Sequence, residues 1–191
     1  MTKEEIRKEY KQKRRKINEA EKDKLERLIL IQFQKLKLPA KAGFMSYLPI
    51  EVQNEYDPWL LEEYYLFVHE NAALVYPLVN PKEETMRAVI VGEENEYEDN
   101  EYGVLEPIGG VKINPKDIGI MIVPLIAFDK NGHRVGYGKG YYDKYIAECS
   151  PDLIKIGVSF FDPIDIDDIN EFDKKLNYCI TPTKTYKFKN K

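Results

Sequence analysis

The chain of 191 residues is 43% hydrophobic and 32% charged, with a formal net charge of −4. This length and composition predict one soluble globular domain, residues 1–191, that can bury a hydrophobic core without disulfide bonds or metal ions to stabilise it. They exclude a disordered chain. No apolar run approaches the roughly 20 residues of a membrane span, the first residues lack the apolar core of a signal peptide, and Cys149 and Cys179 make neither a disulfide framework nor a metal-site spacing. We therefore expect a cytoplasmic protein.

Charge is distributed unevenly along the chain. Residues 3–16 carry eight Lys or Arg against three Glu, whereas residues 93–101 carry six acidic side chains. The acidic run is typical of a solvated loop. The basic run raises the question of RNA binding, but aromatic side chains are not interleaved with it, so we expect no nucleic-acid partner.

The basic run falls within the first of two predicted helices. Residues 2–17 and 19–37 lack Gly and Pro and should form helices that break at the residue between them. At about 100° per residue, Lys3, Arg7 and Arg14 share a stripe beside the apolar one. These side chains are either part of a solvated basic face or the lining of a cleft where the helix meets the body of the protein.

Predicted strands and helices alternate along the rest of the chain. The strands are expected over residues 41–49, 71–79, 85–92, 117–129, 152–160 and 175–181, and the helices over 57–70 and 141–150. The most apolar stretch, 117–129, should be the central strand, with Pro124 ending its regular pairing. Asp57 is the expected N-cap of the helix that follows it. This alternation predicts a layered α/β domain with a mainly parallel sheet.

The stretch RVGYGKGYYD, residues 134–143, follows the central strand and opens a helix. Ligands of α/β proteins bind at the carboxyl ends of strands, where helices begin. Three alternating glycines would let backbone N–H groups approach a phosphate, the Arg and Lys would add positive charge, and Asp143 could hold a magnesium ion. The spacing fits neither the Walker loop nor the dinucleotide fingerprint. The pattern alone therefore leaves a phosphate cradle and a structural turn both open.

Residues 123–146, VPLIAFDKNGHRVGYGKGYYDKYI, closely resemble the signature of the 5-formyltetrahydrofolate cyclo-ligase family, also called methenyltetrahydrofolate synthetases. Three weaker matches lie in the family's order: KEEIR at 3–7, NEYDPWL at 54–60 with Pro58 in place of the usual Thr, and YGVLEP at 102–107. Together they span nearly the whole chain. The resemblance implies a three-layer α/β/α sandwich with a mainly parallel central sheet and an N-terminal helical segment.

The resemblance also implies roles for individual residues. The implied ATP-binding positions are Lys3, Arg7, Arg134, Gly136, Tyr137, Gly138, Lys139, Gly140, Tyr141 and Tyr142. The implied folate-binding positions are Ile50, Glu55, Tyr137, Gly138, Lys139, Gly140 and Tyr141, with Glu51 as a competing alignment for the acidic residue that grips the pterin. Lys139, Arg134 and Tyr141 are expected to carry catalysis, and Asp143 is expected to bind Mg²⁺. Asn177 stands where the family often has a metal-linked Asp, which leaves a second protein ligand for the metal open.

The implied activity is the ATP- and Mg²⁺-dependent closure of 5-formyltetrahydrofolate to 5,10-methenyltetrahydrofolate, with release of ADP and phosphate, through a phosphorylated formyl (iminium phosphate) intermediate. We expect a monomer whose partners are the folate and ATP. Glu106 either contacts ATP or caps a local turn. Pro58 and Asn177 depart from the family's pattern, and they support an alternative, a non-catalytic nucleotide- or folate-binding protein of the same fold.

Overall fold

The computed structural model describes residues 1–92, 94–100 and 103–189. Its helices are α1 (Lys3–Arg15), α2 (Glu19–Lys35), α3 (Trp59–Val68) and α4 (Tyr141–Glu148), with the short 3-10 helices η1 (Glu51–Gln53) and η2 (Pro115–Asp117). Its strands are β1 (Gly43–Met45), β2 (Ala73–Asn80), β3 (Thr85–Ile90), β4 (Tyr97–Asp99), β5 (Leu105–Pro107), β6 (Val111–Lys112), β7 (Ile118–Val123), β8 (Ala127–Phe128), β9 (Arg134–Val135), β10 (Ile154–Val158), β11 (Tyr178–Ile180) and β12 (Thr185–Lys187). This order confirms the predicted α/β class.

An eight-stranded sheet forms the centre of the molecule, in the order β12-β11-β10-β7-β1-β2-β3-β6. The five strands from β11 to β2 run parallel to one another, and the antiparallel strands β12, β3 and β6 extend the sheet at its two sides. The mainly parallel sheet is thus confirmed. As predicted, β7 is a central strand, and it ends at Val123, directly before Pro124, which has no N–H to donate to a ladder.

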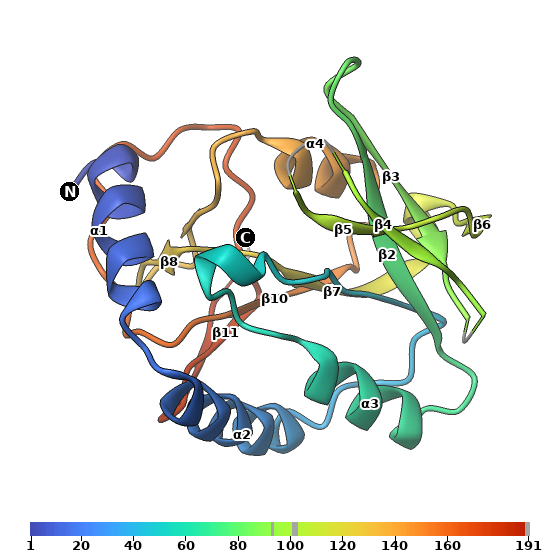
Figure 1. Ribbon diagram of the computed structural model, residues 1–191, viewed down its shortest axis with the longest axis horizontal. Helices are drawn as coiled ribbons and strands as arrows, with labels where there is room; N and C mark the ends of the chain where they lie inside the picture. The colour runs from blue at the N-terminus through green and yellow to red at the C-terminus, as the bar shows by residue number, and fades with distance from the viewer. Residues whose placement is uncertain (93, 101–102, 190–191) are drawn as a thin grey trace.

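Helices cover both faces of this sheet, which gives three layers (Figure 1). One face is covered by α2 and α3, and its core includes Ile29, Phe33, Phe44, Leu61, Tyr65, Ile120, Ile122 and Ile156. The other face carries α4, and its core includes Met45, Val75, Met121, Val123, Tyr145 and Ile146. Successive residues of β7 therefore point into different cores, and both cores consist mainly of hydrophobic side chains, as expected for a parallel strand buried on two sides.

The ends of α1 and α2 are fixed by local hydrogen bonds. At the start of α1, the Thr2 hydroxyl accepts from the Glu5 N–H and the Glu5 carboxylate accepts from the Thr2 N–H, which is a capping box. Asn18, the residue between the two predicted helices, caps α2 by accepting from the Glu21 N–H at 2.9 Å. The predicted break between the helices is confirmed, and it turns α1 away from the helical layer formed by α2 and α3 (Figure 1).

The prediction that the acidic run is a solvated loop was wrong in part. Residues 97–99 form β4, which pairs antiparallel with β5 in a two-stranded hairpin. The side chains of β4 are nevertheless exposed, so the backbone pairs while the acidic groups stay in water. Because every side chain of β4 is exposed, the sequence of this strand shows no alternation of apolar and polar residues from which a strand could be predicted. Glu93, Glu101 and Tyr102, which belong to this run or to YGVLEP, lie outside the described residues.

The predicted cap of α3 also needs a correction. The helix begins at Trp59, and Pro58 occupies the N-cap position without a side-chain hydrogen bond. Asp57 still satisfies one free donor, because its Oδ1 accepts from the Trp59 N–H at 3.0 Å. Asp57 therefore stands one residue before the N-cap, whereas the sequence predicted it at the N-cap. Pro58 is tolerated at the N-cap because the N–H that proline lacks would have no partner within the helix.

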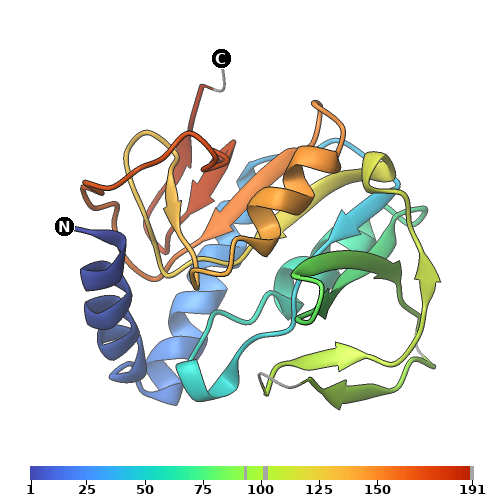
Figure 2. The ribbon, with the colours of Figure 1, turned by 90° about the horizontal axis from the view of Figure 1, so that it is seen from above.

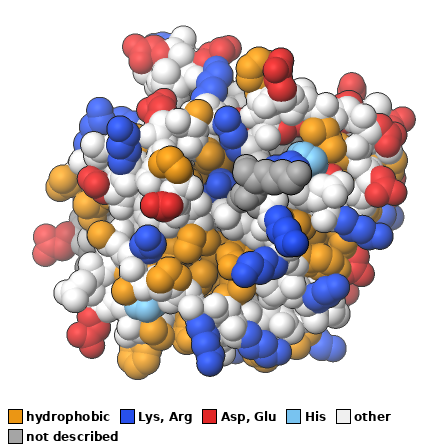
Figure 3. Space-filling model, turned by 180° about the vertical axis from the view of Figure 1, so that it is seen from behind, with side chains coloured by type: hydrophobic (Ala, Val, Ile, Leu, Met, Phe, Trp, Pro, Cys, Tyr) orange, Lys and Arg blue, Asp and Glu red, His pale blue; other side chains and the backbone are white. Residues whose placement is uncertain are grey.

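The surface facing away from the viewer of Figure 1 shows hydrophobic side chains in separate areas with Lys and Arg side chains between them (Figure 3). Among the helices within the described residues, none combines the length and the apolar character that crossing a bilayer requires.

The carboxyl end of β7 leads into the segment that carries the glycine motif. After Pro124 the chain forms the hairpin β8–β9, in which Phe128 pairs with Arg134. The glycines follow β9, and α4 begins immediately after Gly140. Seen from above, this loop faces α1, η1 and the β4–β5 hairpin (Figure 2). The topology thus places the glycine loop at the carboxyl ends of the parallel strands, where its position in the sequence predicted a ligand site.

Candidate active site

A cavity of about 530 Å³ lies among α1, η1, the β4–β5 hairpin and the start of α4. Its lining includes these positions that the resemblance marked for ATP, folate or metal: Lys3, Arg7, Ile50, Glu55, Arg134, Gly136, Tyr137, Gly138, Lys139, Gly140, Tyr141, Tyr142 and Asp143. Segments from the start, the middle and the last third of the chain therefore meet in one pocket. The size falls within the range of small-molecule sites.

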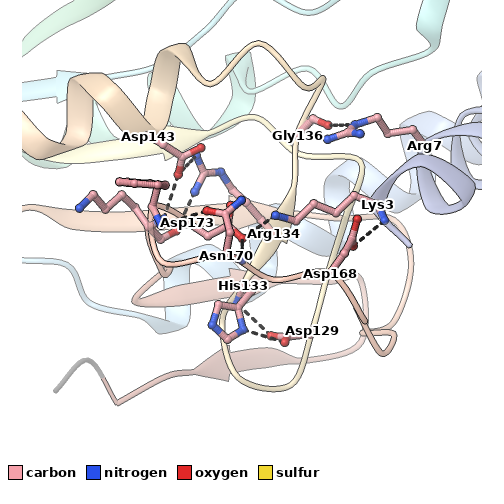
Figure 4. Close-up of polar contacts among 12 residues, drawn as sticks. Lys3, Arg7, Asp129, His133, Arg134, Gly136, Asp143, Asp168, Asn170 and Asp173 are labelled. Atoms are coloured by element: carbon pink, nitrogen blue, oxygen red, sulfur yellow. Dashed lines mark hydrogen bonds and ion pairs between the residues drawn. The ribbon is translucent and has the colours of Figure 1, made fainter. Parts of the chain in front are cut away.

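The basic stripe of α1 lies at this pocket and not on a solvated face. Lys3 Nζ lies 2.5 Å from Asp173 Oδ2, and Arg7 Nε donates to the Gly136 carbonyl oxygen at 2.8 Å (Figure 4). The third member, Arg14, is only 4% exposed and lies behind the pocket wall. The interpretation of the stripe as the lining of a cleft thus holds for Lys3 and Arg7.

The glycines of the loop allow a backbone path that other residues rarely take. Gly138 has φ +97° and Gly140 has φ +73°, both in the left-handed region. A Cβ on Gly138 would lie 3.3 Å from the guanidinium carbon of Arg7, so the arginine packs closely over this glycine. Gly140 is also the N-cap of α4, and its left-handed conformation turns the loop into the helix. The loop therefore brings backbone N–H groups and the start of a helix to the same side of the pocket.

Asp143 and Arg134 hold each other across the loop. Arg134 Nη2 lies 3.1 Å from Asp143 Oδ1, and the same oxygen accepts from the Lys174 N–H at 2.9 Å. Arg134 Nη1 in turn donates to the Lys174 carbonyl oxygen at 2.7 Å (Figure 4). Arg134 is 8% exposed, so this charge is largely committed to the wall of the pocket. The arrangement fixes the Asp143 carboxylate in the first turn of α4.

The sequence analysis did not anticipate two polar residues of the pocket that follow β10. Asp173 and Asn170 lie in an irregular segment after β10, and both line the cavity. Burial alone would raise the pKa of Asp173, but the N–H of Asn170 and the Lys3 ammonium outweigh it and lower that pKa. The residue singled out by sequence, Asn177, does not line the cavity; its Oδ1 accepts from the Lys155 N–H at 2.8 Å. Asp173, four residues earlier, is the acidic side chain from this part of the chain that lines the cavity.

Glu55 is the buried carboxylate of the pocket. It is 2% exposed, and it accepts from the Tyr137 hydroxyl at 2.6 Å and from the Ile50 N–H at 2.9 Å. Burial raises the pKa of Glu55, and the neighbouring Arg14 opposes this effect. Glu51, the competing alignment, is exposed on η1 and does not line the cavity. Of the two candidates, Glu55 is therefore the one that faces the cavity.

The other side of the cavity is largely apolar. Its lining there includes Tyr47, Leu48, Tyr76, Pro77, Val79, Val104, Leu105 and Pro107. Glu106 joins the two halves of this wall, because its Oε1 accepts from the Val79 N–H at 3.0 Å and from Asn100 Nδ2 at 2.9 Å. It both lines the pocket and fixes the hairpin to β2. A flat aromatic ligand fits such a wall better than a phosphate does.

The donor set bears on how a magnesium ion could be held. Within the described residues there is no group of three or more His, Cys, Asp or Glu side chains arranged for a metal. Asp143 and Asp173 nevertheless both line the cavity. Mg²⁺ keeps several waters and usually takes one or two carboxylates together with substrate phosphates. The residues present therefore fit a magnesium ion that arrives with a nucleotide, and not an ion in an all-protein cage.

The sequence and the fold were compared with those of known proteins. The model of the 5-formyltetrahydrofolate cyclo-ligase family matches residues 1–162. A 5-formyltetrahydrofolate cyclo-ligase of Mycoplasma genitalium is 49% identical over 49 residues, which are 26% of this chain and 30% of that protein. The chain thus aligns with less than a third of the length of this curated relative.

Solved structures match over much longer stretches. The methenyltetrahydrofolate synthetase of Aquifex aeolicus has a TM-score of 0.77 and 26% identity, covering 100% of this chain and 95% of that one. The methenyltetrahydrofolate synthetase of Mycoplasma pneumoniae has a TM-score of 0.75 and 25% identity, covering 95% of this chain and 99% of that one. The family match over residues 1–162 and the shared fold show that this chain belongs to the 5-formyltetrahydrofolate cyclo-ligase family.

Proposed function

We propose that this protein closes 5-formyltetrahydrofolate to 5,10-methenyltetrahydrofolate at the expense of ATP, with Mg²⁺ as the metal. The observation that carries the proposal is the single cavity that joins a loop suited to phosphates with an apolar wall and a buried carboxylate. A reaction between a nucleotide and a folate needs both surfaces in one enclosed space. Family membership supplies the substrate class, and the layout of the cavity supports it.

The nucleotide belongs on the side of the glycine loop. Positive charge reaches this side of the cavity from Lys3 and Arg7 of α1 and from Lys139 of the loop. Because Gly138 and Gly140 carry no Cβ, the backbone N–H groups of the loop are accessible to a phosphate. The folate belongs on the apolar side. A pterin ring presents N–H donors at one edge, and the Glu55 carboxylate, an acceptor when ionised, suits them. Tyr137 lies between the two sides.

The chemistry begins from a poor electrophile, because the nitrogen of a formamide feeds electrons to its carbonyl. The formyl oxygen attacks the γ-phosphorus of ATP, a new O–P bond forms, and the bond to the β-phosphate oxygen breaks to release ADP. N10 then attacks the formyl carbon of this iminium phosphate. The C–O bond breaks, inorganic phosphate leaves, and N10 loses its proton, which gives the methenyl bridge between N5 and N10.

The protein's part in these steps is positioning and charge stabilisation, as in other phosphoryl transfers. We assign to Lys139 and the backbone N–H groups of 136–140 the stabilisation of charge on the transferred phosphoryl group. Tyr141, at the start of α4, lines the cavity beside them and can donate its hydroxyl proton to the same group. Arg134 contributes charge to the wall and holds Asp143 in place. Bound Mg²⁺ would neutralise phosphate charge, with Asp143 and Asp173 as the side chains that would hold it.

The test is direct. Purified protein, shown to be folded by circular dichroism, is mixed with 5-formyltetrahydrofolate and MgATP, and the methenyl product is followed by its absorbance. We expect product with one ADP released per product, and none when ATP or Mg²⁺ is omitted. Absence of product across pH and enzyme concentration would overturn the proposal.

The alternative of a non-catalytic binder rested on two departures from the family's pattern. Pro58 lies at the N-cap of α3, and Asn177 pairs with the backbone of Lys155, so neither lines the cavity. No feature of the described pocket now favours that alternative. Calorimetry that shows both ligands binding, together with an absence of product, would support it over the enzyme.

A further inference from the structure

Arg14 is a buried arginine that lies outside the cavity lining and yet contacts several segments that form the cavity. Its Nε donates to the Gln53 carbonyl oxygen at 2.8 Å, and its Nη1 lies 3.5 Å from the Leu125 carbonyl oxygen. Its Nη2 donates to the Tyr137 hydroxyl at 2.6 Å, and Nη1 lies 3.9 Å from Glu55 Oε1. One guanidinium thus connects η1, the segment between β7 and β8, and the glycine loop.

The hydrogen-bond directions in this group are determined by chemistry. A guanidinium can only donate, so the Tyr137 hydroxyl must accept from Arg14. The single proton of that hydroxyl is then directed to Glu55 Oε1, at 2.6 Å, while Glu55 Oε2 accepts from the Ile50 N–H. Both carboxylate oxygens are therefore held by donors from different segments. The carboxylate is fixed in position, and its remaining acceptor capacity faces the cavity.

A buried carboxylate keeps its charge only with compensation. Burial raises the pKa of Glu55, and Arg14 is the largest influence that lowers it, ahead of the Tyr137 and Ile50 hydrogen bonds and the more distant Lys22 of α2. The other titratable groups that interact with Glu55 are two tyrosines, Tyr47 and Tyr142, whose pKa values burial raises, and Lys11 of α1, whose Nζ lies 5.0 Å from the centroid of the Tyr137 ring. Arg14 is thus the main cation opposing the burial of Glu55.

We propose that Arg14 is a positioning residue that holds Glu55, through the Tyr137 hydroxyl, in its charged form and in register with the glycine loop, ready to accept hydrogen bonds from the folate. The proposal rests on the folate site proposed above. Arg14 does not contact the ligand in this scheme. Its loss should therefore weaken folate binding in a way that depends on pH, because the pKa of Glu55, already raised by burial, would rise further without Arg14, and a protonated Glu55 presents a donor where the pterin needs an acceptor.

The experiment compares Arg14→Met with Arg15→Met. Arg15 is exposed in the same turn of α1 and contacts the side chain of the same Gln53, with Nη2 3.0 Å from Oε1. Within the described residues it forms no hydrogen bond or ion pair with Tyr137 or Glu55. Binding of 5-formyltetrahydrofolate without ATP is measured by calorimetry from pH 6 to pH 8.5. For Arg14→Met we expect an affinity below that of wild type at pH 6, which rises with pH by at most about tenfold per pH unit toward the wild-type value. The Arg15→Met variant should follow the wild-type profile.

Tyr137→Phe keeps the ring and removes the bridging hydroxyl, so it tests the same link if Arg14→Met does not fold. We expect the same pH-dependent loss for it, smaller in size because Arg14 remains. A loss of affinity that is equal at every pH, in whichever variant folds, would overturn the proposal and leave Arg14 with a structural role only. Wild-type protein that binds no folate at any pH would instead overturn the proposed function, so the two failures are distinguishable.

Discussion

Lys3, at the beginning of the chain, and Asp173, near its end, form an ion pair with 2.5 Å between Nζ and Oδ2. Their side chains are only 11% and 16% exposed, so the pair is shielded from water more than a surface bridge is. The Lys3 N–H also donates to Asp168 Oδ1 at 2.7 Å, which ties the start of α1 to the same irregular segment. Both residues line the cavity, and the close-up shows their side chains pointing toward each other (Figure 4).

The first prediction concerns this pair. Lys3→Met and Asp173→Asn should each raise the KM for MgATP by about tenfold or more, because a hydrogen bond to a charged group contributes about 1.5–3 kcal/mol. Initial rates over a range of MgATP concentrations measure this. Lys8→Met, which removes an exposed charge from the same helix, is the control and should leave KM unchanged. Equal KM values for all the variants would exclude the pair from nucleotide binding.

Lys139 lies exposed in the glycine loop, so its removal should affect chemistry more than folding. Lys139→Ala should lower kcat by about 100- to 1,000-fold, the usual cost of losing one transition-state donor. Its unfolding free energy should change by only about 0.5 kcal/mol. Lys144→Ala, an exposed lysine on α4 that pairs with Glu84, is the matched control for kcat. A fall in Tm without a fall in kcat would mean that the loop lysine is structural.

Asp143 should control the requirement for magnesium. Asp143→Asn keeps an oxygen that can accept from the Lys174 N–H and removes the negative charge. We expect the Mg²⁺ concentration for half-maximal rate to rise by about tenfold or more, since a metal ligand loses its charge. Glu148→Gln, at the exposed end of the same helix, should leave the Mg²⁺ titration unaltered. If the Asp143→Asn titration coincided with that of wild type, the assignment of Asp143 to the metal would be wrong.

The backbone of the glycine loop allows a paired test of stability. Gly138→Ala places a Cβ at φ +97° and against the Arg7 guanidinium, so it should cost about 1–2 kcal/mol and lower the Tm by about 2–8 °C. A Cβ on Gly136 would have no heavy atom within 4 Å. Gly136→Ala should therefore leave the Tm nearly unchanged. Thermal unfolding without ligands gives both values, and equal shifts would contradict this account of the loop.

Glu62 should make stability depend on pH. This α3 carboxyl group is 4% exposed and accepts from the Tyr76 hydroxyl at 2.7 Å, and burial raises its pKa to about 7. A carboxyl whose pKa is higher in the folded state favours folding when protonated, so its destabilising effect develops as pH rises from about 4.5 to 7.

Glu62→Gln should remove this dependence. At pH 8 we expect the variant to exceed wild type in unfolding free energy by on the order of 3 kcal/mol, since each pKa unit corresponds to about 1.4 kcal/mol. At pH 4.5 the two should be nearly equal. Urea unfolding at both pH values measures the difference, with the exposed neighbour Glu63→Gln as control. A difference that did not change with pH would show that Glu62 is ionised throughout.

The sequence could predict those parts of the fold that depend on residues close together in the chain. The break at Asn18 follows from a capping residue, and the end of β7 follows from Pro124, which cannot continue a ladder. Short strands with exposed side chains, such as β4 and β6, carry no apolar alternation and were not predicted. Their pairing depends on partners elsewhere in the chain, since β4 pairs with β5 and β6 pairs with β3.

The site shows the same division. The glycine loop is continuous in sequence, so its residues could be assigned to one pocket by resemblance, and the cavity contains all of them. Asp173 lies 30 residues downstream of Asp143 in a segment without regular structure, and its place is fixed by Lys3, a contact no local pattern encodes. Arg14 was recognised only as part of a charged stripe, because nothing in α1 alone shows that it meets Glu55.

The position of β1 in the sheet has a consequence for synthesis. Its two neighbours are β2, which follows closely, and β7, which begins at residue 118. A chain still growing on the ribosome therefore exposes one edge of β1, with the fully buried Phe44 and Met45, until some 75 further residues have emerged. Unpaired apolar edges are where nascent chains aggregate. We expect nascent chains that have not yet reached β7 to depend on chaperones. The complete protein, in which β7 covers this edge of β1, should not need them.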